Sequence, residues 1–218
     1  NLYGHLILPS HLKNMARCAF RGCTGLKGDL VIPKSLTVIP PDAFYECGLG
    51  GRLQLHDGIT AIGEDAFRDN GFIGELELPE SLTILEGGNF YGNYFSGSLK
   101  IPKGLLKISS SAFAHCTFSG EVEIPEGILS IGEGAFYNSE NLQKIILPST
   151  LELIDDYAFK SCKSLRVIEC KSTVPPVVRS TAFNGVPLED LTVIVPKSAL
   201  NDYKSSDFWS GLLLKTVE

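Results

Sequence analysis

Six cysteines, four histidines and 25 acidic residues are the side chains of this 218-residue chain that could carry out chemistry. Cysteine and histidine are the usual zinc ligands, but no histidine here has ligand spacing to a pair of cysteines. No Gly-x-Ser-x-Gly motif is present, and no cysteine is paired with a histidine at a distinctive site. We therefore expect no catalytic residue, no metal site and no cofactor.

A glycine-rich stretch at residues 86–95, EGGNFYGNYF, has the composition of a phosphate loop, an aromatic sugar platform or a flexible linker. A phosphate loop needs a Lys-Ser or Lys-Thr pair after its glycines, and none follows here. The stretch keeps the register of a repeat that runs along the chain. Its interpretation therefore depends on that repeat.

The repeat is marked by the pair Ala-Phe, which recurs every 23 or 24 residues. The phenylalanines are Phe20, Phe44, Phe67, Phe90, Phe113, Phe136, Phe159 and Phe183. Asn89 replaces the alanine in one unit. A proline precedes six of these pairs by ten residues, and His56 takes that position in another.

Each repeat unit predicts three short pieces of structure. Alternating apolar residues such as Leu76 and Leu78 predict a strand with one buried face, which proline ends. A second extended segment follows, as in 82–85. The Ile-x-x-x-Ala-Phe pattern, as in 62–67, predicts one helical turn.

Stacking of the units is required because no unit can bury its own apolar face. The sequence therefore predicts one domain, with a solenoid of about eight coils over residues 1–195 and a C-terminal cap over 196–218. The candidates to cover the last coil are Ala199, Leu200, Tyr203, Phe208 and Trp209.

The motifs SLTVIPPDAFYEC, GITAIGEDAFRDN, GILSIGEGAFYNS and LELIDDYAFKSC resemble BspA-like leucine-rich repeats of bacterial and some protist surface proteins. The resemblance covers nearly the whole chain. It implies an exported protein displayed at the cell surface, with a curved scaffold used for adhesion or partner binding. We expect that the signal or anchor segment lies outside this sequence and that a further segment precedes residue 1.

The third residue after each phenylalanine forms one structural position. It is occupied by Cys23, Cys47, Asn70, Asn93, Cys116, Ser139, Cys162 and Val186. We expect these side chains to satisfy buried backbone groups of neighbouring coils. A disulfide between Cys23 and Cys47 is the alternative.

The outward positions of the first strand carry charges of both signs in the central coils. The candidate partner-binding residues are Arg52, Glu75, Glu77, Lys100, Glu121 and Glu123. They form either a solvated surface or a ligand face, and nothing marks two of these carboxylates as the acid and base of a glycosidase. Tyr45, Tyr91 and Tyr137 form a second candidate stripe, which either covers the turn or binds a partner.

Composition excludes some classes of function. The net charge of −6 argues against nucleic acid as a partner. No apolar run approaches the roughly 20 residues of a membrane span. We therefore expect a non-enzymatic surface scaffold that binds a protein, such as a host matrix protein, or a glycan. The alternatives are a structural spacer that presents another domain and a carbohydrate-active solenoid.

The stretch 86–95 keeps one peculiarity within this repeat. Asn89 is polar where the other coils have alanine, and it follows two glycines that weaken a helical turn by about 1 kcal/mol each relative to alanine. We expect a distorted turn here, with Asn89 hydrogen-bonded to the backbone.

Overall fold

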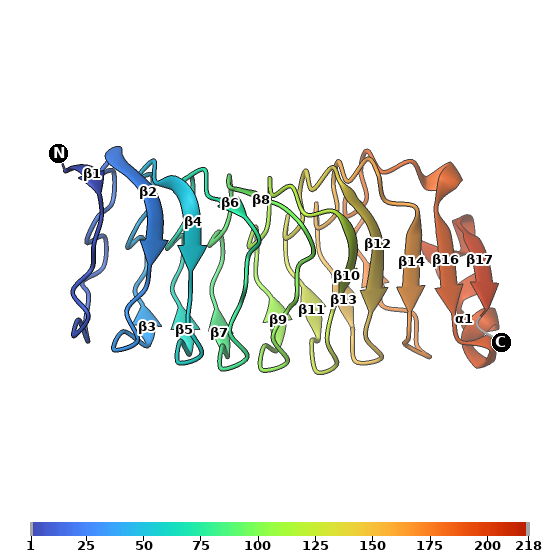
Figure 1. Ribbon diagram of the computed structural model, residues 1–218. Helices are drawn as coiled ribbons and strands as arrows, with labels where there is room; N and C mark the ends of the chain where they lie inside the picture. Colours follow the sequence, from blue (N-terminus) through green and yellow to red (C-terminus); the bar gives the residue numbers. More distant parts are fainter. Residues whose placement is uncertain (1, 217–218) are drawn as a thin grey trace.

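The computed structural model describes residues 2–216 as an elongated solenoid of parallel strands, with about nine turns and little helix (Figure 1). The chain winds from one end of the stack to the other, so the two ends of the described chain lie far apart. The predicted repeat solenoid is confirmed. Within residues 2–216 no helix has the length and apolar character needed to cross a membrane.

The first sheet face is built from the Gly-x-Leu-x-Ile segments. Its strands are β1 (Tyr3–His5), β2 (Gly25–Val31), β4 (Gly50–Gln54), β10 (Gly120–Glu123), β12 (Leu142–Leu147), β14 (Val167–Cys170), β16 (Thr192–Val195) and β17 (Leu213–Thr216). They pair in parallel in the orders β1-β2-β4 and β10-β12-β14-β16-β17. Between these sheets, residues 75–78 and 98–101 are extended but form no named strand, and only Lys100 bridges to Glu123.

The second sheet face is built from the predicted second extended segments. Its strands are β3 (Val38–Ile39), β5 (Ala61–Ile62), β7 (Ile84–Leu85), β9 (Lys107–Ile108), β11 (Ser130–Ile131), β13 (Leu153–Ile154) and β15 (Val177–Val178). They form the sheets β3-β5-β7 and β9-β11-β13-β15. This face is therefore also interrupted, between the fourth coil (residues 74–96) and the fifth coil (residues 97–119).

The third side of the solenoid is made of turns, with one short pair of strands, β6 (Ile73–Gly74) and β8 (Tyr94–Phe95). The expected helical turn is realised as a run of tight turns. Some of its backbone hydrogen bonds stay within the coil, such as Arg68 N–H to the carbonyl of Asp65 at 3.2 Å, and others run between coils. Phe44 N–H donates to the carbonyl of Ala66 at 2.9 Å, and Phe113 N–H donates to that of Ala135 at 2.9 Å. A helix would bond only within its own coil, whereas these turns also connect each coil to the next.

Two positions of the turn hold a left-handed backbone conformation in each of the first seven coils. In the fourth coil they are Gly88 and Gly92, with φ of 67° and 68°. The residue equivalent to Gly88 in the third coil, Asp65, has a φ of 53°. Glycine adopts this conformation without a steric cost, so the turn of the fourth coil follows the same course as the others. The distortion that we expected there is not observed.

Asn89 is fully buried and hydrogen-bonded to backbone, as predicted. Its Oδ1 accepts from Ala66 N–H at 3.2 Å, and its Nδ2 donates to the carbonyl of Glu86 at 2.6 Å. The amide therefore ties the fourth coil both to itself and to the third coil.

The core is a continuous stack of phenylalanine rings, one from each coil. The rings from Phe20 to Phe183, followed by Phe208 of the cap, have successive centroid distances of 5.1–5.9 Å. Offset stacking of this kind adds to the stabilisation that burial alone provides. The core was expected to run continuously through the repeats, and direct contacts between these rings form it.

The cap begins with two short helices, η2 (Lys197–Ala199) and α1 (Leu200–Lys204), and η3 (Trp209–Gly211) follows. Tyr203 and Trp209 are buried, and Phe208 lies on the last ring of the stack. Trp209 Nε1 donates to the carbonyl of Pro176 at 2.9 Å. The aromatic residues expected to cover the last coil therefore do so, and β17 extends the first sheet face beyond them.

The Cys/Asn/Ser position forms a ladder of side-chain hydrogen bonds. In each case the side chain donates to the carbonyl of the phenylalanine one coil earlier: Cys47 to Phe20, Asn70 to Phe44, Asn93 to Phe67, Cys116 to Phe90, Ser139 to Phe113 and Cys162 to Phe136. The donor–acceptor distances range from 2.6 to 3.4 Å. The predicted ladder is confirmed, and all six cysteines are free.

The ladder predicts a stability cost for its removal. Asn93 Oδ1 accepts from Phe72 N–H at 3.0 Å, so Asn93→Ala leaves this buried N–H without a partner. We expect the free energy of unfolding to fall by about 1–3 kcal/mol. Asn93→Cys keeps a donor for the phenylalanine carbonyls. Its free energy of unfolding should therefore lie between those of Asn93→Ala and the parent protein.

Urea denaturation followed by circular dichroism measures these differences. The control is Asn201→Ala, at an exposed position of α1. We expect that variant to stay within about 0.5 kcal/mol of the parent protein. Equal stability of Asn93→Ala and the parent would show that the ladder carries no stabilisation.

Candidate interaction surfaces

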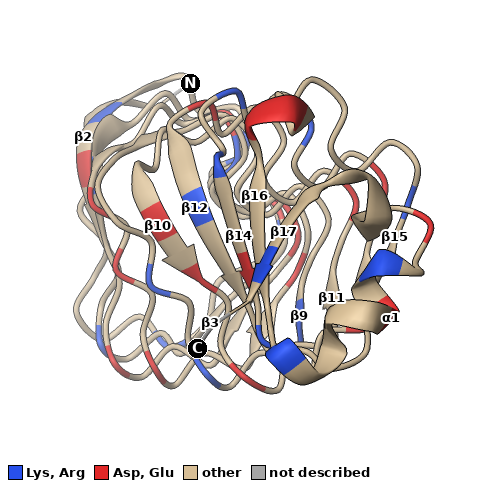
Figure 2. Ribbon diagram, turned by 90° about the vertical axis from the view of Figure 1, so that its right-hand side faces the viewer, with Lys and Arg blue, Asp and Glu red and all other residues tan. Residues whose placement is uncertain are grey.

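The six charged residues predicted to bind a partner all project from the first sheet face. Arg52 is on β4, Glu121 and Glu123 are on β10, and the others lie on the unpaired segments between these strands. They alternate with buried residues such as Leu76, which is why the sequence pattern places them outside. Figure 2 shows basic and acidic residues alternating across β10, β12 and β14.

Ion pairs within the protein occupy one half of this surface. Lys144 Nζ lies 2.9 Å from Glu121 and 3.0 Å from Glu169. Lys171 Nζ lies 2.7 Å from Glu123, and Lys100 pairs with Glu80. The hydrogen bond to Glu121 raises the pKa of Lys144 above its ordinary value. These charges are already neutralised before any partner arrives.

The other half of this surface forms a hollow. Arg52, Glu75 and Glu77 line a cavity of about 510 Å³ beside Leu53 and Gly74. None of the three charged side chains makes an ion pair with another residue of the described chain, 2–216. The hollow lies where the sheet is interrupted, since β4 has no strand partner on the side of residues 75–78. We call these three residues and their cavity the sheet hollow.

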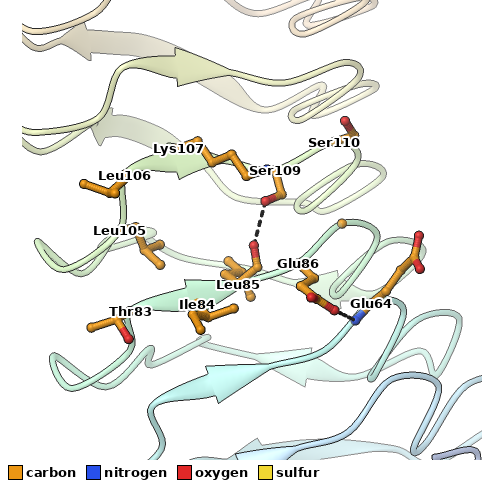
Figure 3. A pocket seen from close by; sticks show the side chains of 11 residues that line it. Glu64, Thr83, Ile84, Leu85, Glu86, Leu105, Leu106, Lys107, Ser109 and Ser110 are labelled. Atoms are coloured by element: carbon orange, nitrogen blue, oxygen red, sulfur yellow. Dashed lines mark hydrogen bonds between the residues drawn. The ribbon is translucent and has the colours of Figure 1, made fainter.

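A groove on the second sheet face was missed by the sequence analysis (Figure 3). Its volume is about 650 Å³, and it lies at the interruption between β7 and β9. Ile84 and Leu106 on its walls are 53% and 69% exposed. The only signal in the sequence was Leu106, which stands where three other coils have threonine.

The groove offers no arrangement for catalysis. Ser109 Oγ donates to the carbonyl of Leu85 at 2.6 Å, and Glu86 accepts a bond from Glu64 N–H at 2.8 Å (Figure 3). The Ser109 hydroxyl, one of the three hydroxyls that line the groove, and one of the two carboxylates therefore satisfy backbone groups. No histidine lines the groove to act as a base for the hydroxyl.

The three tyrosines of the predicted second stripe lie on the third side, half-buried between basic residues. The Arg21 guanidinium lies 4.6 Å from the centre of the Tyr45 ring, and Arg68 lies 4.2 Å from that of Tyr91. Lys160 Nζ lies 5.4 Å from the centre of Tyr137. Cation–π contacts thus hold these rings against the turns.

The buried cysteines are held in the protonated form. Burial raises the pKa of the Cys47 thiol to about 12 and that of Cys162 to about 12, and it also raises the pKa of Cys116. Because the thiolate is the reactive form and the metal ligand, these thiols are poor nucleophiles and poor ligands. Nor does any group of three or more His, Cys, Asp and Glu within residues 2–216 have the arrangement to hold a metal ion.

The family model of the BspA type leucine rich repeat region matches residues 3–97 and 89–208, in six copies. The chain belongs to this family. Its members are typically non-catalytic repeat scaffolds for interactions. A comparison with curated proteins finds no match.

Among solved structures, a leucine-rich cell surface protein from Faecalibacterium prausnitzii A2-165 matches with a TM-score of 0.52 and 23% identity. The match covers 92% of this chain and 62% of that protein, so the chain spans less than two thirds of its length. A leucine-rich repeat protein from Bacteroides ovatus ATCC 8483 matches at a TM-score of 0.39 and 17% identity, over 99% of this chain and 84% of that one. The pneumococcal vaccine antigen PcpA matches with a TM-score of 0.40 and 18% identity, over 88% of this chain and 69% of that one.

Thiol reactivity tests the burial of the ladder. Cys18 and Cys23 are partly exposed, whereas Cys47, Cys116, Cys162 and Cys170 are buried. Native protein treated with iodoacetamide at pH 8 should be modified first at the two exposed cysteines. The other four should react only after denaturation, as measured by peptide mass spectrometry. Modification of Cys116 in the native protein at the rate of Cys23 would contradict this structure.

Proposed function

We propose that this BspA-type repeat protein is a non-enzymatic scaffold at a cell surface that binds a protein partner through the first sheet face. The observation that carries the proposal is the sheet hollow, in which Arg52, Glu75 and Glu77 converge without internal ion pairs. The family and the name of the F. prausnitzii cell surface protein support an exported location.

The free charges are what make this half of the face suited to a partner. A partner that docks on Glu121 or Glu123 has to compete with Lys144 and Lys171. A partner that docks on the sheet hollow breaks no internal ion pair and has to displace only water. Complementary charges would then increase the association rate and select the partner, more than they increase affinity.

The hollow also defines the chemistry of the partner. Two carboxylates and one guanidinium lie in it, so the matching segment presents a basic side chain to Glu75 and Glu77. The same segment presents a carboxylate or carbonyl to Arg52, whose guanidinium can donate two parallel hydrogen bonds. A host extracellular-matrix protein with an exposed basic segment is the partner that we propose.

The stacked coils supply the rigidity that this mode of binding needs. The sheet face is fixed by hydrogen bonds and ring contacts on the other sides of the solenoid. Little backbone ordering is therefore required on binding, so more of the contact energy contributes to affinity.

The test uses a panel of purified matrix proteins immobilised for biolayer interferometry. We expect at least one to bind, and the double variant Glu75→Lys/Glu77→Lys to lower the association rate about tenfold at low ionic strength. The matched control is Glu133→Lys/Glu189→Lys, which makes the same change in net charge at exposed positions away from the first sheet face. The control should bind like the parent, and raising the salt should reduce binding of the parent.

Two results would count against the proposal. Equal loss in the two double variants would mean that net charge alone drives the association. A panel on which no matrix protein binds the parent would exclude this class of partner for the sheet hollow.

A further inference from the structure

A third cavity lies on the third side of the solenoid, away from both sheet faces. Its volume is about 440 Å³, and it spans the turns of the third to sixth coils next to β8. The side chains that define it are Asp69, Tyr91, Tyr94, His115, Asn138 and Glu140. We call it the turn pocket.

The turn pocket arises from a local change in the row of aromatic and basic side chains along the turns. At the position after the spine phenylalanine, tyrosine alternates with arginine or lysine in most coils, but the fifth coil has Ala114 there and the eighth has Asn184. The ring of His115, the next residue, fills the row instead. Its centroid lies 4.9 Å from that of Tyr91 and 4.9 Å from that of Tyr137. The row is therefore displaced at this coil, and the pocket opens beside it.

Two features keep the turn pocket open and accessible. Gly92 lines it without a side chain, and a Cβ at this position would collide with the carboxylate of Asp69. Tyr94 has 63% of its surface exposed, although its backbone is fixed by a bond from its N–H to the carbonyl of Phe72 at 2.8 Å. The Tyr94 side chain therefore lines the pocket and is largely exposed to solvent.

The charged groups of the pocket already have partners. Asp69 accepts a hydrogen bond from Arg68 Nε at 3.2 Å, and Glu140 accepts one from Lys163 Nζ at 2.6 Å. The pocket therefore offers little net charge to an ion. The remaining recognition groups are aromatic faces, the amide of Asn138 and the amide of Asn141, which can both donate and accept.

We propose that the turn pocket binds a neutral sugar ring. A pyranose has an apolar C–H face, which packs on an aromatic ring such as Tyr94, and a rim of hydroxyls, which match neutral amides. Asn138 Nδ2 already lies 3.4 Å from His115 Nδ1, a long contact that a sugar hydroxyl could replace. This site is separate from the sheet hollow, so a glycan and a protein partner could be bound at the same time.

The test is a titration of the protein with neutral monosaccharides and disaccharides, followed by backbone amide chemical shifts. The probes are glucose, galactose, N-acetylglucosamine and lactose. We expect at least one to shift the resonances of the turns that contain Tyr94, His115 and Asn138. Tyr94→Ala should weaken that binding about tenfold, which is the loss expected when a packed ring contact is removed.

The matched control is Tyr3→Ala, because Tyr3 is 78% exposed at the other end of the solenoid. That variant should bind like the parent, and both variants should keep the parent's circular dichroism spectrum and melting temperature. Glucuronic acid and tetramethylammonium test the inferred neutrality of the pocket. The proposal is overturned if neither neutral sugar class shifts these turns, if Tyr94→Ala binds like the parent, or if either charged probe binds more tightly than every neutral sugar.

Because the two sites share no residue, the two proposals can fail separately. The variants of Glu75 and Glu77 should leave sugar binding unchanged. Tyr94→Ala should likewise leave capture by matrix proteins unchanged.

Discussion

The hydrogen bond from one coil's Cys, Asn or Ser side chain to the phenylalanine carbonyl of the preceding coil is the interaction on which the rest of the solenoid depends. This carbonyl belongs to the turn that carries the ring stack, and it can accept a second hydrogen bond from its own coil, as Phe20 does from Cys23 N–H at 3.0 Å. The N–H of the same phenylalanine is satisfied by the alanine carbonyl of the following coil, as for Phe44 and Ala66. The N–H and the carbonyl of such a spine residue are thereby both bonded to the following coil. The spacing that results brings successive rings to within 5.1–5.9 Å.

Much of this arrangement could be predicted because each structural position is repeated about eight times in the sequence. The shared substitution of Cys, Asn and Ser indicated a small polar donor, and the aromatic residues after position 196 indicated a cap. The turns were predicted less well. Ile-x-x-x-Ala-Phe has helical spacing, but residues such as Asp65, with a φ of 53°, break a helix at the same point in each coil. The residue types found at the position of Asp65 do not by themselves exclude a helix. The sequence pattern therefore favoured a helical turn, whereas the structure has a run of tight turns.

For the candidate site, the sequence pattern predicted which side chains face outward but not which of them form ion pairs. Alternation placed Glu77 and Glu123 outside equally well, yet only Glu123 is neutralised, by Lys171 from 48 residues further along the chain. Whether a charge is paired depends on its distance to side chains of other coils. The residue pattern of a single strand carries no information about those distances. His115 is a similar case. Its sequence position differs from that of the tyrosines, and only the space left by Ala114 brings its ring into their row.

Three of the hollows lie beside departures from the repeat. Cavities of about 570 Å³ and 520 Å³ also lie beside the paired strands β1 and β2 and the paired strands β13 and β15, so a hollow does not require an interrupted ladder. At the second-face interruption, the carbonyl of Leu85 accepts from Ser109 Oγ. The carbonyls of Ile62 and Ile108 instead accept from the backbone N–H groups of Glu86 and Gly132, each in the following coil. A side chain has replaced a backbone bond there, and a groove of about 650 Å³ lies beside it. The sheet hollow likewise adjoins a strand with no partner on one side, and the turn pocket lies beside the displaced aromatic row. Outward residues can vary freely in such a solenoid without disturbing the stack, whereas these three hollows coincide with changes in the stack itself. Those changes lie within or next to the fourth and fifth coils.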